Sequence, residues 1–157
     1  MKKNKAQDNN NYIVAKNKKA KFNYIIENTY EAGIVLTGSE IKSLRKNSAS
    51  ISDGFVTFSD DYEMFLNNIF IAEYKFSAGF FAHSPKRKRK LLMHHKEIVK
   101  LKKALDTKGI SIVPTKIYFK NGIAKVEVAV GKGKKLYDKR DAIKQRDVDR
   151  DLNRRYK

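Results

Sequence analysis

Short runs of β-branched and aromatic residues, separated by polar turns, make up most of the hydrophobic pattern along this chain. Residues 24–27 and 33–36 predict two early strands. Residues 55–58 and 64–71 flank the polar turn 59–62, so we expect them to pair as a hairpin. The first half of the chain is therefore predicted to be mainly β-structure.

Two other stretches repeat their apolar positions every three or four residues, as amphipathic helices do. Thr37 and Glu40 have the Thr-x-x-Glu spacing of a capping box. Ile41 and Leu44 follow at helical spacing, which predicts a short helix with a basic outer side. A second helix, ending at Gly109, is predicted by the apolar positions Leu91, His95, Ile98, Leu101 and Leu105.

Five consecutive basic residues, 86–90, stand directly before the second predicted helix. Such a run is too charged for a hydrophobic core, and at a helix start its positive charges oppose the helix dipole. We therefore expect it to be exposed and to require an external anion.

The dipeptide Asn121-Gly122 is the strongest local signal, because a two-residue type I′ turn needs positive φ at both positions. The turn places Lys120 opposite Ile123 and so predicts the register of the whole hairpin. One face carries the pairs Ile117–Val126 and Phe119–Ala124, and the other carries Lys116–Glu127 and Tyr118–Lys125. Upstream, Pro114 predicts an edge or a bulge.

These elements predict a mainly β fold with about six antiparallel strands, which favours a small closed antiparallel β-barrel of the OB-fold type. Two or three short helices would flank it, and an open α+β sheet is the alternative. We expect a flexible basic N-terminus over residues 1–15, a barrel domain over 16–131 and a C-terminal tail over 132–157.

Charge sharpens this division, because the net charge of +18 on 157 residues is not spread evenly. Residues 1–21 carry 7 basic and 1 acidic residue, residues 83–103 carry 9 and 1, and residues 131–157 carry 11 and 5. The rest of the chain is close to neutral. Basic segments attached to a near-neutral body predict a polyanion-binding footprint.

The tail is the most polar of these segments, since 13 of the 20 residues from Asp138 to Lys157 are charged. It has too little apolar surface to offset its ordering entropy. We expect it to be disordered in isolation and helical on a partner. The preceding residues 131–135, with two glycines and three lysines, are expected to be a flexible basic hinge.

Candidate catalytic chemistry is sparse. The chain has no cysteine, and its histidines, His83, His94 and His95, lack metal-ligand spacing and are expected to be surface or helix-packing residues. Residues 131–134 lack the spacing of a phosphate-binding P-loop, and Asp60-Asp61 fits the hairpin turn. We therefore expect no catalytic centre, no metal site and no cofactor.

RNA is the polyanion that best fits basic segments interleaved with aromatic residues. DNA is less favoured because no helix-turn-helix or basic zipper is evident. A membrane is disfavoured because no stretch approaches a membrane span and neither an insertion face nor a lipidation motif is present. A ribosomal or ribosome-assembly protein and a Mg²⁺-dependent RNA-processing enzyme are the alternatives.

Several strings, in this order and spacing, closely resemble the bacterial SsrA-binding (SmpB) family from about residue 16 to the C-terminus. They are Asn17-Lys18-Lys19-Ala20, Glu31-Ala32-Gly33-Ile34, Gly38-Ser39-Glu40-Ile41-Lys42-Ser43-Leu44-Arg45, the run from Pro85 to Leu92, Lys132-Gly133-Lys134-Lys135 and Asp138-Lys139-Arg140. Each string is weak alone, but the ordered set is highly specific.

The resemblance implies a cytoplasmic, monomeric, non-catalytic adaptor that binds the tRNA-like domain of tmRNA and brings it to stalled ribosomes for trans-translation. Its implied partners are tmRNA, the small ribosomal subunit with its rRNA and, through tmRNA, elongation factor Tu and alanyl-tRNA synthetase. Implied tmRNA contacts are Asn17, Lys18, Lys19, Glu31, Arg45, Leu92 and Lys125. Implied contacts of the tail with the decoding centre are Gly133, Tyr137, Asp138, Lys139 and Arg140, with Tyr137 placed to stack on an rRNA base; the tail would continue into the vacant mRNA channel.

Overall fold

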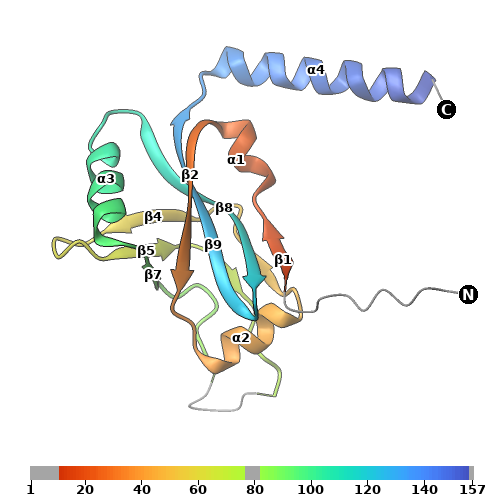
Figure 1. Ribbon diagram of the computed structural model, residues 1–157. Helices are drawn as coiled ribbons and strands as arrows, with labels where there is room; N and C mark the ends of the chain where they lie inside the picture. Colours follow the sequence, from red (N-terminus) through yellow and green to blue (C-terminus); the bar gives the residue numbers. More distant parts are fainter. Residues whose placement is uncertain (1–10, 77–81, 156–157) are drawn as a thin grey trace, which may run out of the picture.

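The computed structural model describes residues 11–76 and 82–155 (Figure 1). In chain order its elements are β1 (Tyr12–Lys16), α1 (Lys18–Asn23), β2 (Tyr24–Ile34), α2 (Gly38–Arg45), β3 (Ala49–Ser50), β4 (Phe55–Phe58), β5 (Met64–Asn67), β6 (Phe70–Ile71), β7 (Arg89–Leu92), α3 (His95–Leu105), β8 (Ile110–Lys120), β9 (Ile123–Gly133) and α4 (Leu136–Arg155). The prediction of a mainly β fold is confirmed.

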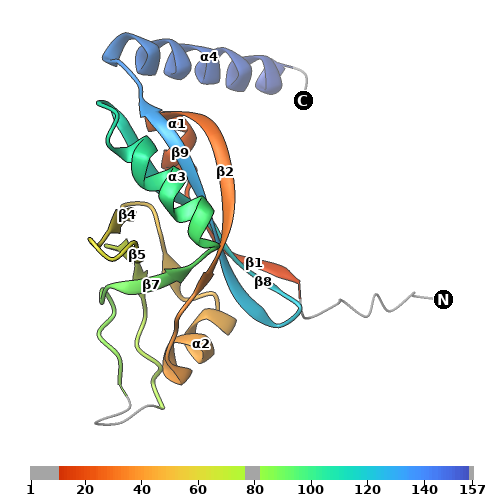
Figure 2. The same ribbon diagram turned by 60° about the vertical axis from the view of Figure 1, so that its left-hand side comes forward.

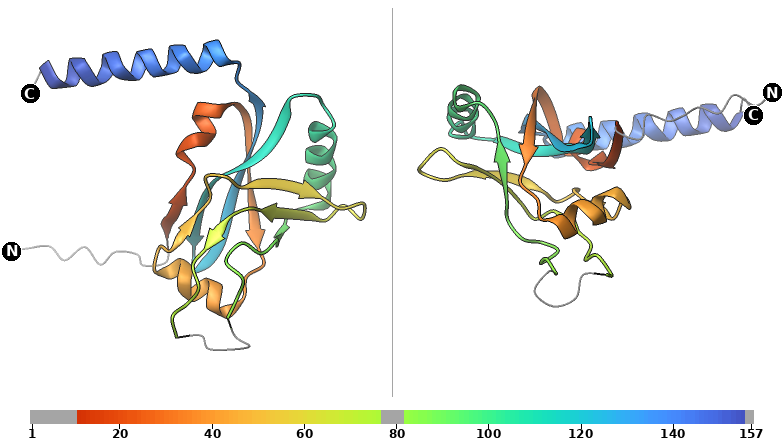
Figure 3. Two further views of the ribbon diagram at one scale, coloured as in Figure 1. Left: turned by 180° about the vertical axis from the view of Figure 1, so that it is seen from behind. Right: turned by 60° about the horizontal axis from the view of Figure 1, so that its bottom comes forward.

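Seven of the strands form one antiparallel sheet in the order β1-β8-β9-β2-β7-β5-β4, and β3 pairs separately with β6. The sheet curls so that β4 and β5 cross the long strands β2, β8 and β9 (Figure 3), and β4 contacts β8. The order nevertheless ends at β1 and β4, and no backbone pairing within the described ranges joins these two strands. The predicted barrel requires hydrogen bonds that close the sheet on itself. This closure is not observed, because β4 and β8 meet through side chains instead.

The β8–β9 hairpin has the register predicted from its turn. Lys120 pairs with Ile123 and Tyr118 with Lys125, and the register shifts between Pro114 and Lys116 as a bulge. Asn121 and Gly122 both have positive φ, at 52° and 76°, as the type I′ turn demands. The hairpin predicted around the turn 59–62 is confirmed for its inner part, because β4 pairs with β5 from Phe55–Asn67 to Phe58–Met64. Its second strand ends at Asn67, and residues 70–71, predicted to continue it, form β6 and pair with β3.

The core lies inside the curl of the sheet and beneath α2 and α3. Its fully buried side chains include Leu44, Leu66, Leu101, Ile117 and Val126. Figure 2 shows α3 alongside the long strands, where it contacts β8. None of the helices in the described part of the chain is long and apolar enough to cross a membrane.

The N-terminal part of the fold differs from the prediction. The two early strands are one strand, β2, which pairs with β9 along its length and absorbs a register shift between Ile26 and Asn28. Between the predicted strands, Asn28, Thr29 and Glu31 are exposed and Ala32 is buried. Residues 12–15, predicted to be flexible, belong to β1, which pairs with β8; residues 1–10 lie outside the described residues. Neither β1 nor α1 was predicted, because both depend on pairing or packing with distant segments.

The second predicted helix starts later and ends earlier than expected, because it stops at Leu105 rather than at Gly109. Residues 89–92 form the strand β7, and only His95–Leu105 is helical, as α3. In β7, Arg89 and Leu91 point inward while Leu92 is 52% exposed, so the side chains alternate with period two. Four residues are too few for sequence periodicity to separate a strand from a helical turn.

The hinge predicted at residues 131–135 is wrong for its first part. Gly131 and Gly133 belong to β9 and pair with Ile26 and Tyr24 of β2. A Cβ at Gly131 would lie 2.8 Å from the Tyr24 Cβ, so the glycine permits close strand packing. The Lys134 N–H donates to Asn23 O over 2.9 Å, so the chain leaves the body only after Lys134.

Candidate nucleic-acid interface

Three of the predicted RNA contacts lie together on the outer face of the sheet, on adjacent strands. Gly33 of β2 pairs with Lys125 of β9 on one side and with Leu92 of β7 on the other, and Glu31 lies two residues before it. Their chain neighbours Ala32 and Leu91 are buried in the core, so Glu31, Leu92 and Lys125 point away from it. We call this surface, with Tyr118 and Lys120 of β8, the Glu31 face.

Glu31 is the centre of a polar network on this face. Its carboxylate accepts a hydrogen bond from the Tyr118 hydroxyl and lies 2.9 Å from Lys125 Nζ and 3.3 Å from Lys120 Nζ. The Tyr118 hydrogen bond first, and then the two lysines, lower the pKa of Glu31 to about 2. Burial and the bond to Glu31 raise the pKa of Tyr118, so its hydroxyl remains a donor. The site is an ionised acceptor held by one hydroxyl and two flexible cations.

Glu127 continues this polar ladder on β9, directly opposite Glu31. It accepts from Thr115 Oγ1 and lies 2.7 Å from Lys116 Nζ. Burial opposes its ionisation, but the bonds from Lys116 and Thr115 outweigh it and lower its pKa. The hairpin register predicted that these side chains share a face; it gave no reason to single out Tyr118 or Lys120, whose importance comes from contacts with another strand.

Asn17, Lys18 and Lys19 lie at the start of α1. The Asn17 side chain is the N-cap: its Oδ1 accepts from the Ala20 N–H over 3.0 Å and its Nδ2 donates to Pro114 O over 2.9 Å. Asn17 is only 8% exposed, so it holds α1 on the sheet rather than presenting an open amide. Lys18 and Lys19 are exposed beside it, and Lys19 Nζ lies 3.5 Å from Asp53.

Arg45 is separate from this group. It is an exposed residue at the end of α2, whereas α1 and α4 lie at the opposite end of the molecule (Figure 1). The structure thus brings Glu31, Leu92 and Lys125 together on adjacent strands, and it places Arg45 on α2, away from α1.

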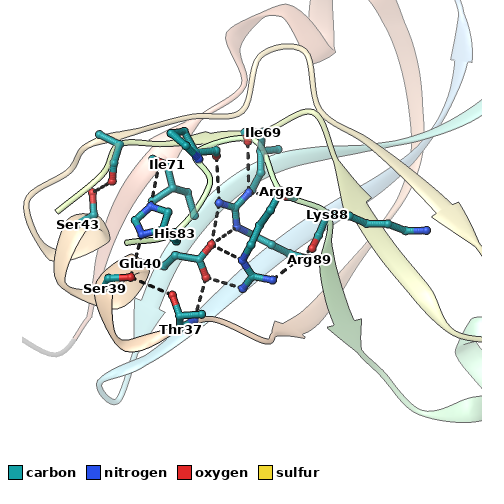
Figure 4. Close-up of polar contacts among 12 residues, drawn as sticks. Thr37, Ser39, Glu40, Ser43, Ile69, Ile71, His83, Arg87, Lys88 and Arg89 are labelled. Atoms are coloured by element: carbon teal, nitrogen blue, oxygen red, sulfur yellow. Dashed lines mark hydrogen bonds and ion pairs between the residues drawn. The ribbon is translucent and has the colours of Figure 1, made fainter. Parts of the chain in front are cut away.

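The basic run 86–90 is partly internal, which corrects the expectation that it is exposed at a helix start. Figure 4 shows Arg87 and Arg89 converging on Glu40 of α2. Arg87 donates from Nε over 2.7 Å and from Nη2 over 2.6 Å, and Arg89 donates from Nε over 2.8 Å. Both Arg89 and Glu40 are completely buried.

Glu40 is therefore the anion that this run requires. Burial raises its pKa, but the Arg87 bonds, the Thr37 N–H at 2.8 Å and the charge of Arg89 outweigh burial and lower it. The remaining Arg89 donors reach the carbonyls of Pro85, Arg87 and Ile69. The capping box was predicted, but its glutamate has this second role, which only the fold reveals.

The predicted ribosome-binding residues lie at the junction of β9 and α4. Gly133 is the last residue of β9, Tyr137 is 61% exposed, and Lys139 and Arg140 follow in the first turns of α4. The Asp138 carboxylate accepts from the Lys135 N–H over 3.3 Å and so caps the helix start. Farther along, Arg146 lies 5.2 Å from the Phe22 ring of α1.

The histidines are structural or exposed. His83 is buried, with Nδ1 2.9 Å from Ser39 Oγ and Nε2 3.1 Å from Ile71 O (Figure 4). His94 precedes α3 as its N-cap, and His95 packs edge-on against Tyr62. Within residues 11–76 and 82–155, no group of histidine and acidic side chains has the arrangement of a metal site.

Comparison with known proteins gives concordant matches. The family model "SmpB protein" matches residues 14–157. The SsrA-binding protein of Persephonella marina is 52% identical over 145 residues, covering 92% of this chain and 94% of its own. That of Lactobacillus delbrueckii subsp. bulgaricus is 48% identical over 155 residues, 99% of both chains. A solved structure described as "tmRNA-SmpB: a journey to the center of the bacterial ribosome" matches with a TM-score of 0.65 and 42% identity over 77% of this chain and 84% of that chain.

Proposed function

The chain belongs to the SmpB family of SsrA-binding proteins, and from this membership we propose that it binds tmRNA and brings it to stalled ribosomes for trans-translation. The family match over residues 14–157 is the observation that carries the proposal. The protein acts as a non-catalytic, monomeric RNA-binding adaptor in the cytoplasm. Elongation factor Tu and alanyl-tRNA synthetase meet it through the shared tmRNA.

The Glu31 face and the start of α1 are the proposed contact with the tRNA-like domain. Lys18, Lys19 and Lys125 supply positive charge for phosphates, and the exposed Leu92 supplies an apolar surface for a base or sugar. Glu31, ionised at neutral pH, accepts from a base amino group or a ribose 2′-hydroxyl. Asn17 contributes by fixing α1, and Arg45 contributes to RNA binding from α2.

The body over residues 16–131, related to OB-like barrels, is the tmRNA-binding domain in this proposal. The tail over 132–157 engages the decoding centre and the vacant mRNA channel, with Tyr137 stacking on an rRNA base and Gly133, Asp138, Lys139 and Arg140 beside it. Residues 136–155 form the helix α4 in the structure of the chain alone, where disorder was predicted. Exposed apolar side chains such as Ile143 and Leu152 give this helix a surface that can pack on a partner.

A salt-matched competition tests this function. The protein is bound to the labelled tRNA-like domain of tmRNA at physiological salt, and excess bulk tRNA is added. We expect the complex to persist and Glu31→Gln to weaken it, whereas Glu27→Gln, an exposed carboxylate on the same strand, leaves it unchanged. Equal competition by bulk tRNA would contradict the proposal and favour a ribosomal protein that binds RNA by charge alone.

A further inference from the structure

A second cluster of cations and aromatic rings lies beside α2, at the end of the molecule opposite α1 and α4 (Figure 1). We call it the Tyr74 patch and define it as Lys42, Lys46, Tyr74 and Phe76. Lys46 Nζ lies 4.8 Å from the centre of the Tyr74 ring and 5.2 Å from that of Phe76. Lys42 Nζ lies 5.5 Å from the Tyr74 ring, and the two ring centres are 5.5 Å apart.

The patch is open to solvent. Phe76 is 77% exposed, which leaves a large apolar ring in water, and both lysines are exposed, whereas Tyr74 is half-buried. Arg45 stands on the same helix and is exposed as well. Across residues 11–76 and 82–155, the salt bridges engage none of these three cations, although Glu73 precedes Tyr74 in the chain.

Exposed rings flanked by cations are the arrangement that binds single-stranded nucleic acid, because bases stack on the rings and phosphates meet the cations. A protein partner would favour a larger apolar surface with fewer charges. A membrane would favour an amphipathic insertion face rather than two rings inclined at 60°.

We propose that the Tyr74 patch is a second RNA-binding surface, which takes an unpaired base on Phe76 or Tyr74 and the adjoining phosphates on Lys42 and Lys46. This goes beyond the proposed binding of the tRNA-like domain, because the patch lies on α2 and residues 74–76, whereas the Glu31 face lies on the strands β2, β7, β8 and β9. One protein then holds two RNA segments at once.

The test measures binding of the full-length protein to a fluorescent 12-nucleotide oligo(U) RNA over a salt series. Because stacking contributes appreciably per base, the double variant Tyr74→Ala/Phe76→Ala should bind about tenfold more weakly with an unchanged salt slope. Lys42→Ala/Lys46→Ala should instead reduce the salt slope by about 1.4, since each phosphate contact on a single strand contributes about 0.7. Phe76→Ala alone should also weaken oligo(U) binding. Because this side chain is 77% exposed, the substitution leaves the core undisturbed.

Tyr62→Ala is a matched control. Tyr62 lies on the β4–β5 turn, is 42% exposed and has Lys102 Nζ 4.4 Å from the centre of its ring. We expect this variant to bind oligo(U) as the wild type does. RNA carrying 4-thiouridine should crosslink to Tyr74 or Phe76, which locates the site despite the high overall charge.

Unchanged oligo(U) binding by the ring variants, or an equal loss in Tyr62→Ala, would overturn the proposal. Crosslinks confined to other surfaces would also overturn it. The same holds if the ring variants lose binding to anionic phosphatidylserine vesicles but keep their binding to RNA. Affinity for the tRNA-like domain is measured in parallel and should change less than about twofold in the ring variants, as expected for separate sites. If the wild type shows no preference for that domain, the proposed function fails while the oligo(U) test still decides the patch.

Discussion

Two glutamates in this protein are each surrounded by cations, one inside the fold and one on its outer surface. Glu40 is completely buried and is held by Arg87, Arg89 and the Thr37 N–H. Glu31 keeps 37% of its side chain exposed and is held by a tyrosine hydroxyl and two lysines. In both, hydrogen bonds and nearby positive charge lower the pKa.

The difference lies in the partners. Arginine presents a planar fork of fixed donors, which can satisfy both carboxylate oxygens and neighbouring carbonyls inside the protein. Lysine is a point charge on a flexible stem that can move to another anion. The Glu40 cluster is therefore closed and stabilises the fold, whereas the Glu31 face can exchange its internal bonds for bonds with a ligand.

Removal of the buried anion should have the largest effect. Glu40→Gln leaves two guanidinium groups around a neutral amide, and breaking a buried ion pair in this way destabilises a fold by about 3–5 kcal/mol. Urea unfolding would measure the loss. Glu31→Gln is the matched control, and it should change the free energy of unfolding by less than about 1 kcal/mol. Equal losses in the two variants would contradict the distinction between the clusters.

Acid should weaken the Glu40 cluster. The pKa of Glu40 lies below its ordinary value of 4.5 in the folded protein, so its ionisation stabilises the fold above that pH. This stability is lost as the pH falls through the folded pKa. Wild-type unfolding free energy should decline as the pH falls below about 5, and less steeply in Glu40→Gln. Parallel profiles in unfolding scans at each pH would show that another group is responsible.

On the Glu31 face, loss of a hydrogen-bond partner should lower RNA affinity rather than the free energy of unfolding. Tyr118→Phe deletes only the hydroxyl that donates to Glu31, which leaves the carboxylate held by Lys120 and Lys125. Without this hydroxyl the carboxylate is positioned only by two flexible lysines, so affinity for the tRNA-like domain should fall about three- to tenfold. Fluorescence anisotropy would measure it, with urea unfolding of the same variant as the control. Unchanged affinity with lowered stability would mean that Tyr118 serves the fold alone.

The tail should have the smallest effect on tmRNA affinity, because it leaves the body after Lys134. Tyr137→Ala, or truncation before Asp138, should change affinity for the tRNA-like domain by less than about twofold, as distant sites act independently. Either change should abolish tagging of stalled chains in a reconstituted translation reaction. Weakened tmRNA binding in the truncated protein would overturn this separation of roles.

The elements that were predicted correctly depend on residues close together in the chain. Asn121-Gly122 determines its hairpin register through the φ angles of two residues, and Thr37 with Glu40 marks the start of α2. The strand β7 was assigned to a helix because Leu91 and Leu92 fit either period, and only pairing with β2 and β5 decides between them.

The candidate site divides in the same way. Family-type motifs singled out Glu31, Leu92 and Lys125, and the structure brings these residues onto one face. Motifs could not show that Asn17 is buried as a cap or that Tyr118 and Lys120 complete the Glu31 network. Those facts depend on residues as far as 97 positions apart in the chain.

The sequence by itself determined the mainly β character, the local turns and caps, the segregated positive charge and the resemblance to a family. These follow from backbone preferences and from the order of residues, which are local properties. The tertiary structure alone decided which charges are internal, because a charge is buried only where the fold supplies a counter-charge and hydrogen bonds. Arg89 and Lys88 are neighbours in one basic run, yet Arg89 is buried against Glu40 and Lys88 faces solvent.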